Sequence, residues 1–431
     1  MKNKITKWYK LAIFFLILIY SCKKEFTNES SVSSDPHDKE FVSTLYNPFG
    51  VYVAASAANQ NSANTSDPSK QTILKYGNRT LLAKDYGVKY MRMMVNKDDW
   101  KDSAYKSGFL FTFGSNMQSG LKIILNVNSH PIDGKAYPYP DATDFSVWVK
   151  VVLDSINIHQ LKPELVVVEN EETNGVYHLI NYTSQQTIDS SLQQYVNELS
   201  ATINVCKNYT CWDGQKGIKV TNGGFTTRGI TFDTWNWLYY NVPDTAAARK
   251  YALNSMSPVT YNNIYTSLRY NHVPPVYIQT SVNMSKFLQS KYQTLSLNYT
   301  NIHWYEPAKV RGWVETVEGG TPWSKGVSQD STSKTVLETS ISYFTANFTP
   351  KVVSNAIGQL TTSSNLTTDI CTKVLTRQDG AFYYACLFDG DGADAYDAKA
   401  LHNTIITGTV DSYTKRPSGN AFKKANAKQN N

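Results

Sequence analysis

Three glutamates crowd one short stretch of the sequence, VVVENEETN at residues 166–174. Glu169, Glu171 and Glu172 follow a run of valines that predicts a buried strand. Like charges placed so close raise one pKa, which a general acid requires. On a continuing strand, Glu169 and Glu171 would share a face while Glu172 points away. The stretch is a candidate acid site, although rim charges or a structural ion pair would explain the same residues.

Two further stretches end apolar runs with residues of possible function. In PKVVSNAIGQ, residues 350–359, the position over a cleft is taken by Ala356, whose methyl group has no lone pair for covalent chemistry. In NIHWYE, residues 301–306, His303 and Tyr305 alternate onto one strand face, where they could position a substrate or a carboxylate. A buried, hydrogen-bonded histidine is the simpler alternative. Trp304 offers an aromatic face for stacking on a sugar.

Eight apolar or β-branched runs must position these residues. They cover residues 49–55, 88–95, 121–128, 164–170, 217–224, 300–305, 350–355 and 381–389. Helical patterns separate the runs, and near-continuous apolar strands are typical of a parallel sheet covered by helices. The pattern predicts an α/β fold, a (β/α)8 TIM barrel, with an elaborated loop region between strands five and six. In such a barrel, functional side chains gather at the C-terminal strand ends.

Within this predicted barrel, residues 45 to about 425 resemble the retaining glycoside hydrolases of the large (β/α)8-barrel clan, the clan A type. The Asn170–Glu171 pair carries the most specific part of the resemblance, and it implies that Glu171 is the general acid/base. The tail RPSGNAFKKA is similar to the closing segment whose helix seals the barrel in several of these families. The other matching positions are Arg92, His303, Tyr305 and Asp389.

The resemblance breaks at strand seven. In the clan the attacking glutamate stands in a context such as VVSNEIGQ, where this chain reads VVSNAIGQ with Ala356. Retention requires two carboxylates about 5 to 5.5 Å apart, and alanine supplies none. Three explanations are open: a barrel that binds glycans with cleavage impaired or absent, a glutamate deliberately replaced, or another carboxylate such as Glu306. Arg92 would then lack the nucleophile as a partner, and we expect it to meet Glu171, Asp389 or an anion.

The N-terminus predicts export. A basic segment and a short apolar core precede Cys22, which follows a small residue as in a bacterial lipobox. We expect residues 1–21 to be a lipoprotein signal peptide, Cys22 to carry a lipid anchor, and residues 22–44 to form a flexible tether. A plain secretory signal is the alternative. The expected location is the bacterial cell envelope, periplasmic or at the cell surface.

Composition and motifs argue against several classes of function. Loss of the leader removes four lysines from a net charge of +7, which leaves too little positive charge to predict nucleic-acid binding. No zinc spacing, phosphate loop or nucleophile elbow occurs, so no metal or cofactor is expected. Cys206 and Cys211 are near enough in sequence to pair, but the sequence does not decide whether they do.

The leading interpretation is therefore a glycoside hydrolase-like lipoprotein, a pseudoenzyme in carbohydrate metabolism that engages a polysaccharide or oligosaccharide. The alternatives are an active hydrolase of O-glycosyl bonds and a non-catalytic scaffold or interaction protein. Sugar identity, endo or exo action and oligomeric state are not encoded in any pattern of this sequence. Glycan contacts are expected from Arg92, Asn128, Asn170, His303, Trp304, Tyr305 and Asp389.

Overall fold

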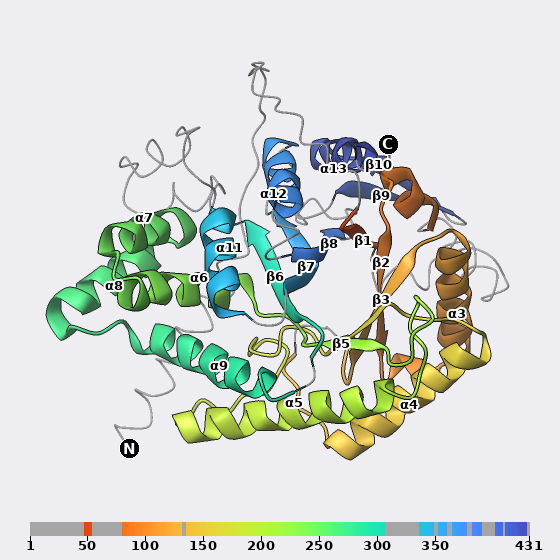
Figure 1. Ribbon diagram of the computed structural model, residues 1–431, viewed down its shortest axis with the longest axis horizontal. Helices are drawn as coiled ribbons and strands as arrows, with labels where there is room; N and C mark the ends of the chain where they lie inside the picture. Colours follow the sequence, from red (N-terminus) through yellow and green to blue (C-terminus); the bar gives the residue numbers. More distant parts are fainter. Residues whose placement is uncertain are drawn as a thin grey trace.

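The computed structural model describes residues 47–53, 80–131, 135–295, 297–306, 336–348, 352–359, 364–376, 382–389, 401–407 and 410–428. Eight strands form one parallel sheet that curves through the centre of the molecule, with helices outside it (Figure 1). The strands are β1 (Phe49–Val53), β2 (Tyr90–Asn96), β3 (Lys122–Asn128), β4 (Leu165–Val168), β5 (Lys219–Thr221), β6 (Thr300–Glu306), β7 (Val352–Gln359) and β8 (Phe382–Asp389). Each of them overlaps a run that the sequence predicts as a strand.

The sheet runs in the order β5-β4-β3-β2-β1-β8-β7-β6, the order of a (β/α)8 barrel. No ladder joins β5 to β6 in the described part of the chain. Side-chain contacts help to span this gap: Asn222 Nδ2 donates to the Asn301 carbonyl at 3.0 Å, and the Asn301 backbone N–H donates to Asn222 Oδ1 at 2.6 Å. Single backbone bonds cross it as well, from the Asn298 N–H to the Val220 carbonyl at 3.2 Å and from the Phe225 N–H to the Asn301 carbonyl at 3.1 Å. An isolated parallel bridge between Phe225 and Ile302 continues the joint.

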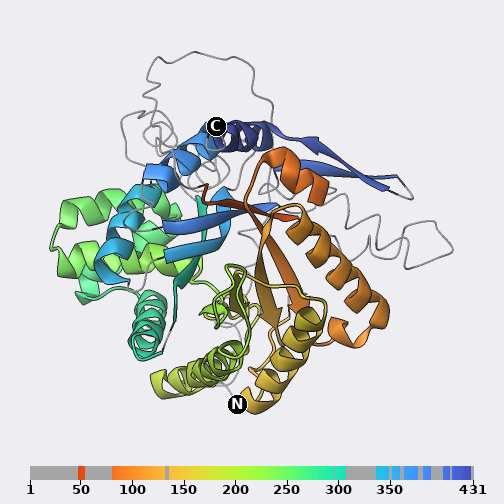
Figure 2. The same ribbon diagram turned by 45° about the vertical axis from the view of Figure 1, so that its right-hand side comes forward.

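The helices form the outer layer, as Figure 2 shows from a second direction. They are α3 (Ser103–Gln118), α4 (Ala142–Ile158), α5 (Gln185–Cys206), α6 (Thr227–Asn236), α7 (Thr245–Ser255), α8 (Pro258–Asn271), α9 (Val276–Tyr292), α11 (Val336–Asn347), α12 (Ser364–Thr376) and α13 (Pro417–Ala427). The region expected as an elaborated loop between strands five and six contains four of these helices, α6 to α9. Capping explains the start of α8: Ser257 accepts from the Thr260 amide, and Pro258 follows at the first turn.

The barrel interior is layered. Its lower layer is a small apolar cluster separate from the main core between sheet and helices, formed by Tyr90, Ile124, Leu165, Val167 and Val353. Alternate residues of a strand point to the same face. Two positions further along their strands, the inner face therefore carries Arg92, Asn126 and Asn355, all at most 3% exposed. A buried polar layer thus lies on the apolar one, toward the C-terminal strand ends.

The C-terminal part contains a hairpin that the sequence reasoning missed, β9 (His402–Thr407) paired antiparallel with β10 (Val410–Lys415). The helix that follows, α13, was expected to close the barrel. Its Phe422 is fully buried, and its ring meets that of Phe49 in β1 edge to face with centroids 5.6 Å apart. A side chain on Gly419 would lie 2.1 Å from the Leu401 carbonyl oxygen, so only glycine permits this approach.

Two further predictions concern the cysteines and the N-terminal segment. Cys206 and Cys211 are buried free thiols and form no disulfide with each other. Residues 1–44, with the signal peptide, Cys22 and the tether, lie outside the described residues. None of the helices in the described ranges is both long and apolar enough to cross a membrane.

Candidate functional site at the C-terminal end of the barrel

Glu171 projects from the loop after β4 and is the most accessible of the three glutamates. Its backbone is left-handed, with φ of 52°, a conformation that costs a non-glycine residue about 1 kcal/mol or more. The side chain is 15% exposed. One carboxylate oxygen lies 2.9 Å from His303 Nδ1, and the other accepts from Asn174 Nδ2 at 2.6 Å. The acid is therefore held at two points while an edge remains open to solvent.

Ala356 lies on the same strand face as His303. In the ladder between β6 and β7, His303 pairs with Ala356 and Tyr305 with Gly358. Residues in register on neighbouring parallel strands share a face. A side chain on Gly358 would indeed meet the Tyr305 ring at 3.8 Å. Glu171 and Ala356 are thus both neighbours of His303, the first by a hydrogen bond and the second by register.

Strand seven is longer than predicted. It was expected to end at residue 355, but it runs to Gln359, so Ala356 stands inside the strand. The register against β6 shifts between Asn301 and His303, which marks a bulge at this point. A bulge sets two consecutive residues toward one side. This accounts for the inward position of both Asn355 and Ala356.

Arg92 points toward β7 but does not meet Glu171. Its NH1 donates to the Asn355 carbonyl at 3.2 Å, and its NH2 donates to Asn126 Oδ1 at 2.8 Å and Asn170 Oδ1 at 2.9 Å. The guanidinium also lies 5.0 Å from the centre of the Tyr52 ring. Of the three partners expected for Arg92, Glu171 is not contacted, and the side chain of Asp389 lies outside the described residues. Within the described residues this buried cation is surrounded by amide oxygens and an aromatic face.

The amides around Arg92 form one hydrogen-bonded network across the barrel, which we call the amide belt. Asn126 Nδ2 donates to Asn128 Oδ1 at 3.0 Å, and Asn355 Nδ2 donates to Asn126 Oδ1 at 2.9 Å. Asn301 Nδ2 donates in turn to Asn355 Oδ1 at 2.8 Å. The members of the belt are Asn96, Asn128, Asn126, Asn170, Asn355, Asn301 and Asn222. Because buried polar groups need partners, these residues hold each other in place.

Glu169 and Glu172 take different directions from Glu171. Glu169 Oε1 accepts from the Ser129 amide at 2.9 Å, and Glu172 Oε1 accepts from Asn222 Nδ2 at 2.7 Å and the Tyr292 hydroxyl at 2.9 Å. Burial raises the pKa of each of these two carboxyls to about 7. The expectation that Glu169 and Glu171 share a strand face was wrong, because β4 ends at Val168 and positive φ values follow.

Two predictions on β6 were wrong for one reason. Trp304 is fully buried in the core between sheet and helices, and its Nε1 donates to Glu306 Oε2 at 3.2 Å. Residues 304 and 306 therefore share the outer face, opposite to His303. Trp304 cannot stack on a sugar, and Glu306 cannot reach the side of the barrel that holds Glu171. Asp389 is the last residue of β8, but its side chain lies outside the described residues.

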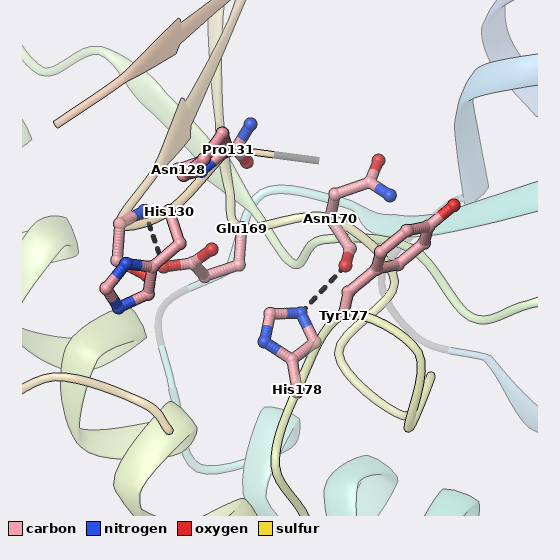
Figure 3. A pocket seen from close by; sticks show the side chains of 8 residues that line it. Asn128, His130, Pro131, Glu169, Asn170, Tyr177 and His178 are labelled. Carbon is pink, nitrogen blue, oxygen red and sulfur yellow. Dashed lines mark hydrogen bonds between the residues drawn. The ribbon is translucent and has the colours of Figure 1, made fainter. Parts of the chain in front are cut away.

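A small pocket lies beside this site at the ends of β3 and β4, with Glu169 and His130 on one side and Tyr177 on the other (Figure 3). It includes the predicted Asn128 and Asn170. His178 Nε2 lies 2.8 Å from the Asn170 carbonyl, and burial lowers the pKa of His178 to about 4. The sequence reasoning missed the loop residues here. Their only signal is that they follow predicted strand ends. The lining residues are Asn128, Ser129, His130, Pro131, Glu169, Asn170, Tyr177 and His178.

Within the described ranges, no group of three or more His, Cys, Asp or Glu side chains is arranged to hold a metal ion.

No protein-family model matches the sequence, and no curated protein matches it. Solved structures of glycosidases resemble it in fold. A β-glycosidase from Thermosphaera aggregans superimposes with a TM-score of 0.50 at 10% identity, covering 90% of this chain and 97% of that one. A rice β-glucosidase gives 0.50 at 10% identity, covering 87% and 96%.

A family 39 glycoside hydrolase from Bacteroides cellulosilyticus gives 0.44 at 12% identity. The match covers 88% of this chain and 63% of that one, so this chain spans less than two thirds of that protein. At such identities the likeness shows the fold alone. The chain has the parallel α/β barrel fold of the β-glycosidase and the β-glucosidase.

Proposed function

We propose that this protein, whose barrel fold is shared with glycosidases, engages a polysaccharide or oligosaccharide through the C-terminal ends of its strands. Glu171 is the acid/base position, and cleavage is impaired or absent because Ala356 stands where a nucleophile would be needed. The observation that carries the proposal is the convergence of both positions on His303. Glu171 binds this imidazole at 2.9 Å, and Ala356 is its register partner.

The chemistry of the site supports this assignment. Retaining cleavage needs an acid and an attacking carboxylate on one side of the sugar. Glu171 can provide the acid, because it is partly exposed and held by His303 and Asn174. Among the described side chains, the nearby carboxyls of Glu169, Glu172 and Glu306 are not placed to replace the nucleophile. Glu169 and Glu172 are buried in their own hydrogen bonds, and Glu306 faces the helices. The glycosidases of similar fold suggest β-linked glycosides as the ligand class.

Restoring the carboxylate tests the proposal. We expect Ala356→Glu to hydrolyse aryl β-glycosides, while the wild type and the matched control Ala356→Gln do not. The double variant Ala356→Glu with Glu171→Gln should lose that gain by two orders of magnitude or more, as acid/base catalysis contributes about 10²- to 10⁴-fold. Azide should substitute for the carboxylate in the wild type: its nitrogen bonds the anomeric carbon as the aryloxide leaves, giving an inverted glycosyl azide.

Binding provides the second readout. The wild type should retain members of a β-linked oligosaccharide array, and Glu171→Gln should keep this binding because an amide still hydrogen-bonds the glycosidic oxygen. An array with no retained glycan, together with an inert Ala356→Glu variant, would sink the proposal. It would favour the non-catalytic scaffold.

We further propose that the mature chain is a lipoprotein of the bacterial cell envelope, held at the membrane through Cys22. The basic segment, apolar core and cysteine of residues 1–22 support this. Metabolic labelling with a fatty acid should mark the wild type and not Cys22→Ser, and the variant should leave the membrane fraction. Equal labelling of both would exclude a lipid anchor at this cysteine.

A further inference from the structure

His303 lies between two groups that define where its protons sit. Its Nδ1 is 2.9 Å from Glu171 Oε1, and its Nε2 is 2.7 Å from Asn355 Oδ1. Each imidazole nitrogen either carries a proton and donates a hydrogen bond, or has no proton and accepts a hydrogen bond. The protonation of the ring therefore follows once the orientation of the Asn355 amide is known, because an amide offers oxygen at one end and N–H at the other.

The first anchor of that orientation is Arg92, whose guanidinium has donors only. Its NH2 donates to Asn126 at 2.8 Å, so the contacted Asn126 atom must be the oxygen. The same oxygen lies 2.9 Å from the Asn355 amide, which must turn its nitrogen toward it. The other end of that amide, the end that faces His303, is therefore oxygen.

The second anchor is independent and comes from the main chain. The Asn355 backbone N–H donates to Asn301 Oδ1 at 3.0 Å, which fixes the oxygen end of Asn301. Its Nδ2 end donates to the Asn222 carbonyl at 3.1 Å and to Asn355 Oδ1 at 2.8 Å. Both anchors give Asn355 the same orientation. A flip would break contacts on both sides at once.

We propose that Asn355 is a positioning residue whose fixed carbonyl oxygen keeps a proton on His303 Nε2, so that His303 Nδ1 and Glu171 must share one further proton. The assignment rests on the proposed acid role of Glu171. With Nε2 protonated, a neutral ring has a bare Nδ1, which would oppose its lone pair to a bare carboxylate at 2.9 Å. A protonated Glu171 or a doubly protonated His303 removes this conflict. Either way the pair retains one acidic proton between His303 Nδ1 and Glu171 Oε1.

The imidazole nitrogens can be read directly by ¹⁵N NMR. The chain has only 7 histidines, and His303→Gln identifies the signal. At neutral pH we expect the intact protein to show a protonated Nε2 on His303. His178 is an internal reference, because its Nε2 faces the Asn170 carbonyl and must also be protonated. A bare Nε2 with a protonated Nδ1 on His303 would overturn the proposal without any variant.

Two substitutions at Asn355 should act in different ways. Asn355→Asp keeps an acceptor opposite Nε2, so Nε2 stays protonated. Asn355→Leu removes the acceptor, and the proton should move to Nδ1, where it can be donated directly to a Glu171 carboxylate. The exposed Asn208→Leu is the matched control and should change nothing. If the proton positions on His303 do not change in Asn355→Leu, the role of Asn355 is refuted. General damage to the fold would change the His303 signals in both variants alike.

These readouts separate the two proposals. The His303 proton positions are independent of any sugar. If they are as expected and no glycan binds, the proposed function fails while the role of Asn355 stands. If glycans bind and the protons are placed otherwise, the reverse holds.

Discussion

The direction in which each glutamate side chain points after β4 depends on backbone dihedrals more than on sequence spacing. Glu169 and Glu171 have φ values of 61° and 52°. These left-handed steps break the alternation of a strand and turn three neighbouring carboxyls in three directions. Only Glu171 reaches the imidazole of His303. Strain of this kind persists where the surrounding structure over-determines it, and such positions cluster at functional sites.

Gly224 controls the approach of His303 to its partners, and it provides a prediction at the scale of one residue. A Cβ at this position would lie 2.5 Å from His303 Cδ2, and the backbone φ of 116° already disfavours other residues. We expect Gly224→Ala to lower the free energy of unfolding by about 3 kcal/mol, through backbone strain plus a clash. The displaced ring should also lose its contact with Asn355.

Gly217→Ala is the matched control. Its φ is 96°, but an added Cβ meets nothing within 4 Å, so it isolates backbone strain at about 1 to 2 kcal/mol. Urea denaturation measures both variants. Equal destabilisation would show that contact with His303 adds nothing, contrary to our expectation.

Secondary structure was predictable where burial imposes a pattern. All eight barrel strands coincide with apolar runs, because both faces of a covered parallel sheet exclude water. The β9–β10 hairpin escaped prediction because HNTIITGTVDSYTK offers no comparable apolar run. The end of β7 was misplaced for a related reason. Periodicity does not reveal a bulge, and the bulge is what turns Ala356 inward next to Asn355.

The candidate site was predictable in its residue types and not in its contacts. Topology directs Arg92 of β2, Glu171 of the loop after β4 and His303 of β6 toward the C-terminal side of the barrel, as expected from this fold. The partners could not be foreseen. Arg92 meets amides from β3, the loop after β4 and β7, and no local pattern links those asparagines. Trp304 failed as a sugar platform because the inner or outer face of β6 depends on register.

The molecule buries several carboxyl groups, and their raised pKa values determine whether its stability rises or falls with pH. Burial raises the pKa of Glu169 and Glu172 to about 7 and of Asp233 to about 8. The folded protein therefore binds more protons than the unfolded chain above about pH 4.5. His178, whose pKa burial lowers to about 4, opposes this below pH 6.5. The carboxyls outnumber it, so stability falls as pH rises.

We accordingly expect the free energy of unfolding to decrease between pH 5 and pH 8 by several kcal/mol, since one pKa unit corresponds to about 1.4 kcal/mol. Glu198 sharpens the test. Burial raises its pKa well above the ordinary value, and neither carboxyl oxygen has a hydrogen-bond partner among the described residues. Glu198→Gln should flatten the slope in urea titrations. Stability that rises with pH across this window would contradict the burial of these acids.

The joint between β5 and β6 differs from the other joints of the barrel in how it responds to amino-acid substitution. A ladder of backbone hydrogen bonds survives nearly every substitution, because all residues except proline carry the same donor and acceptor. The joint between β5 and β6 has only a few backbone hydrogen bonds, such as the one from the Phe225 N–H to the Asn301 carbonyl at 3.1 Å, and it adds the side-chain amides of Asn222 and Asn301 to them. A single codon change can loosen it, and a reversion can tighten it again. Natural variation can therefore tune the opening of this barrel at one place while leaving its laddered joints untouched.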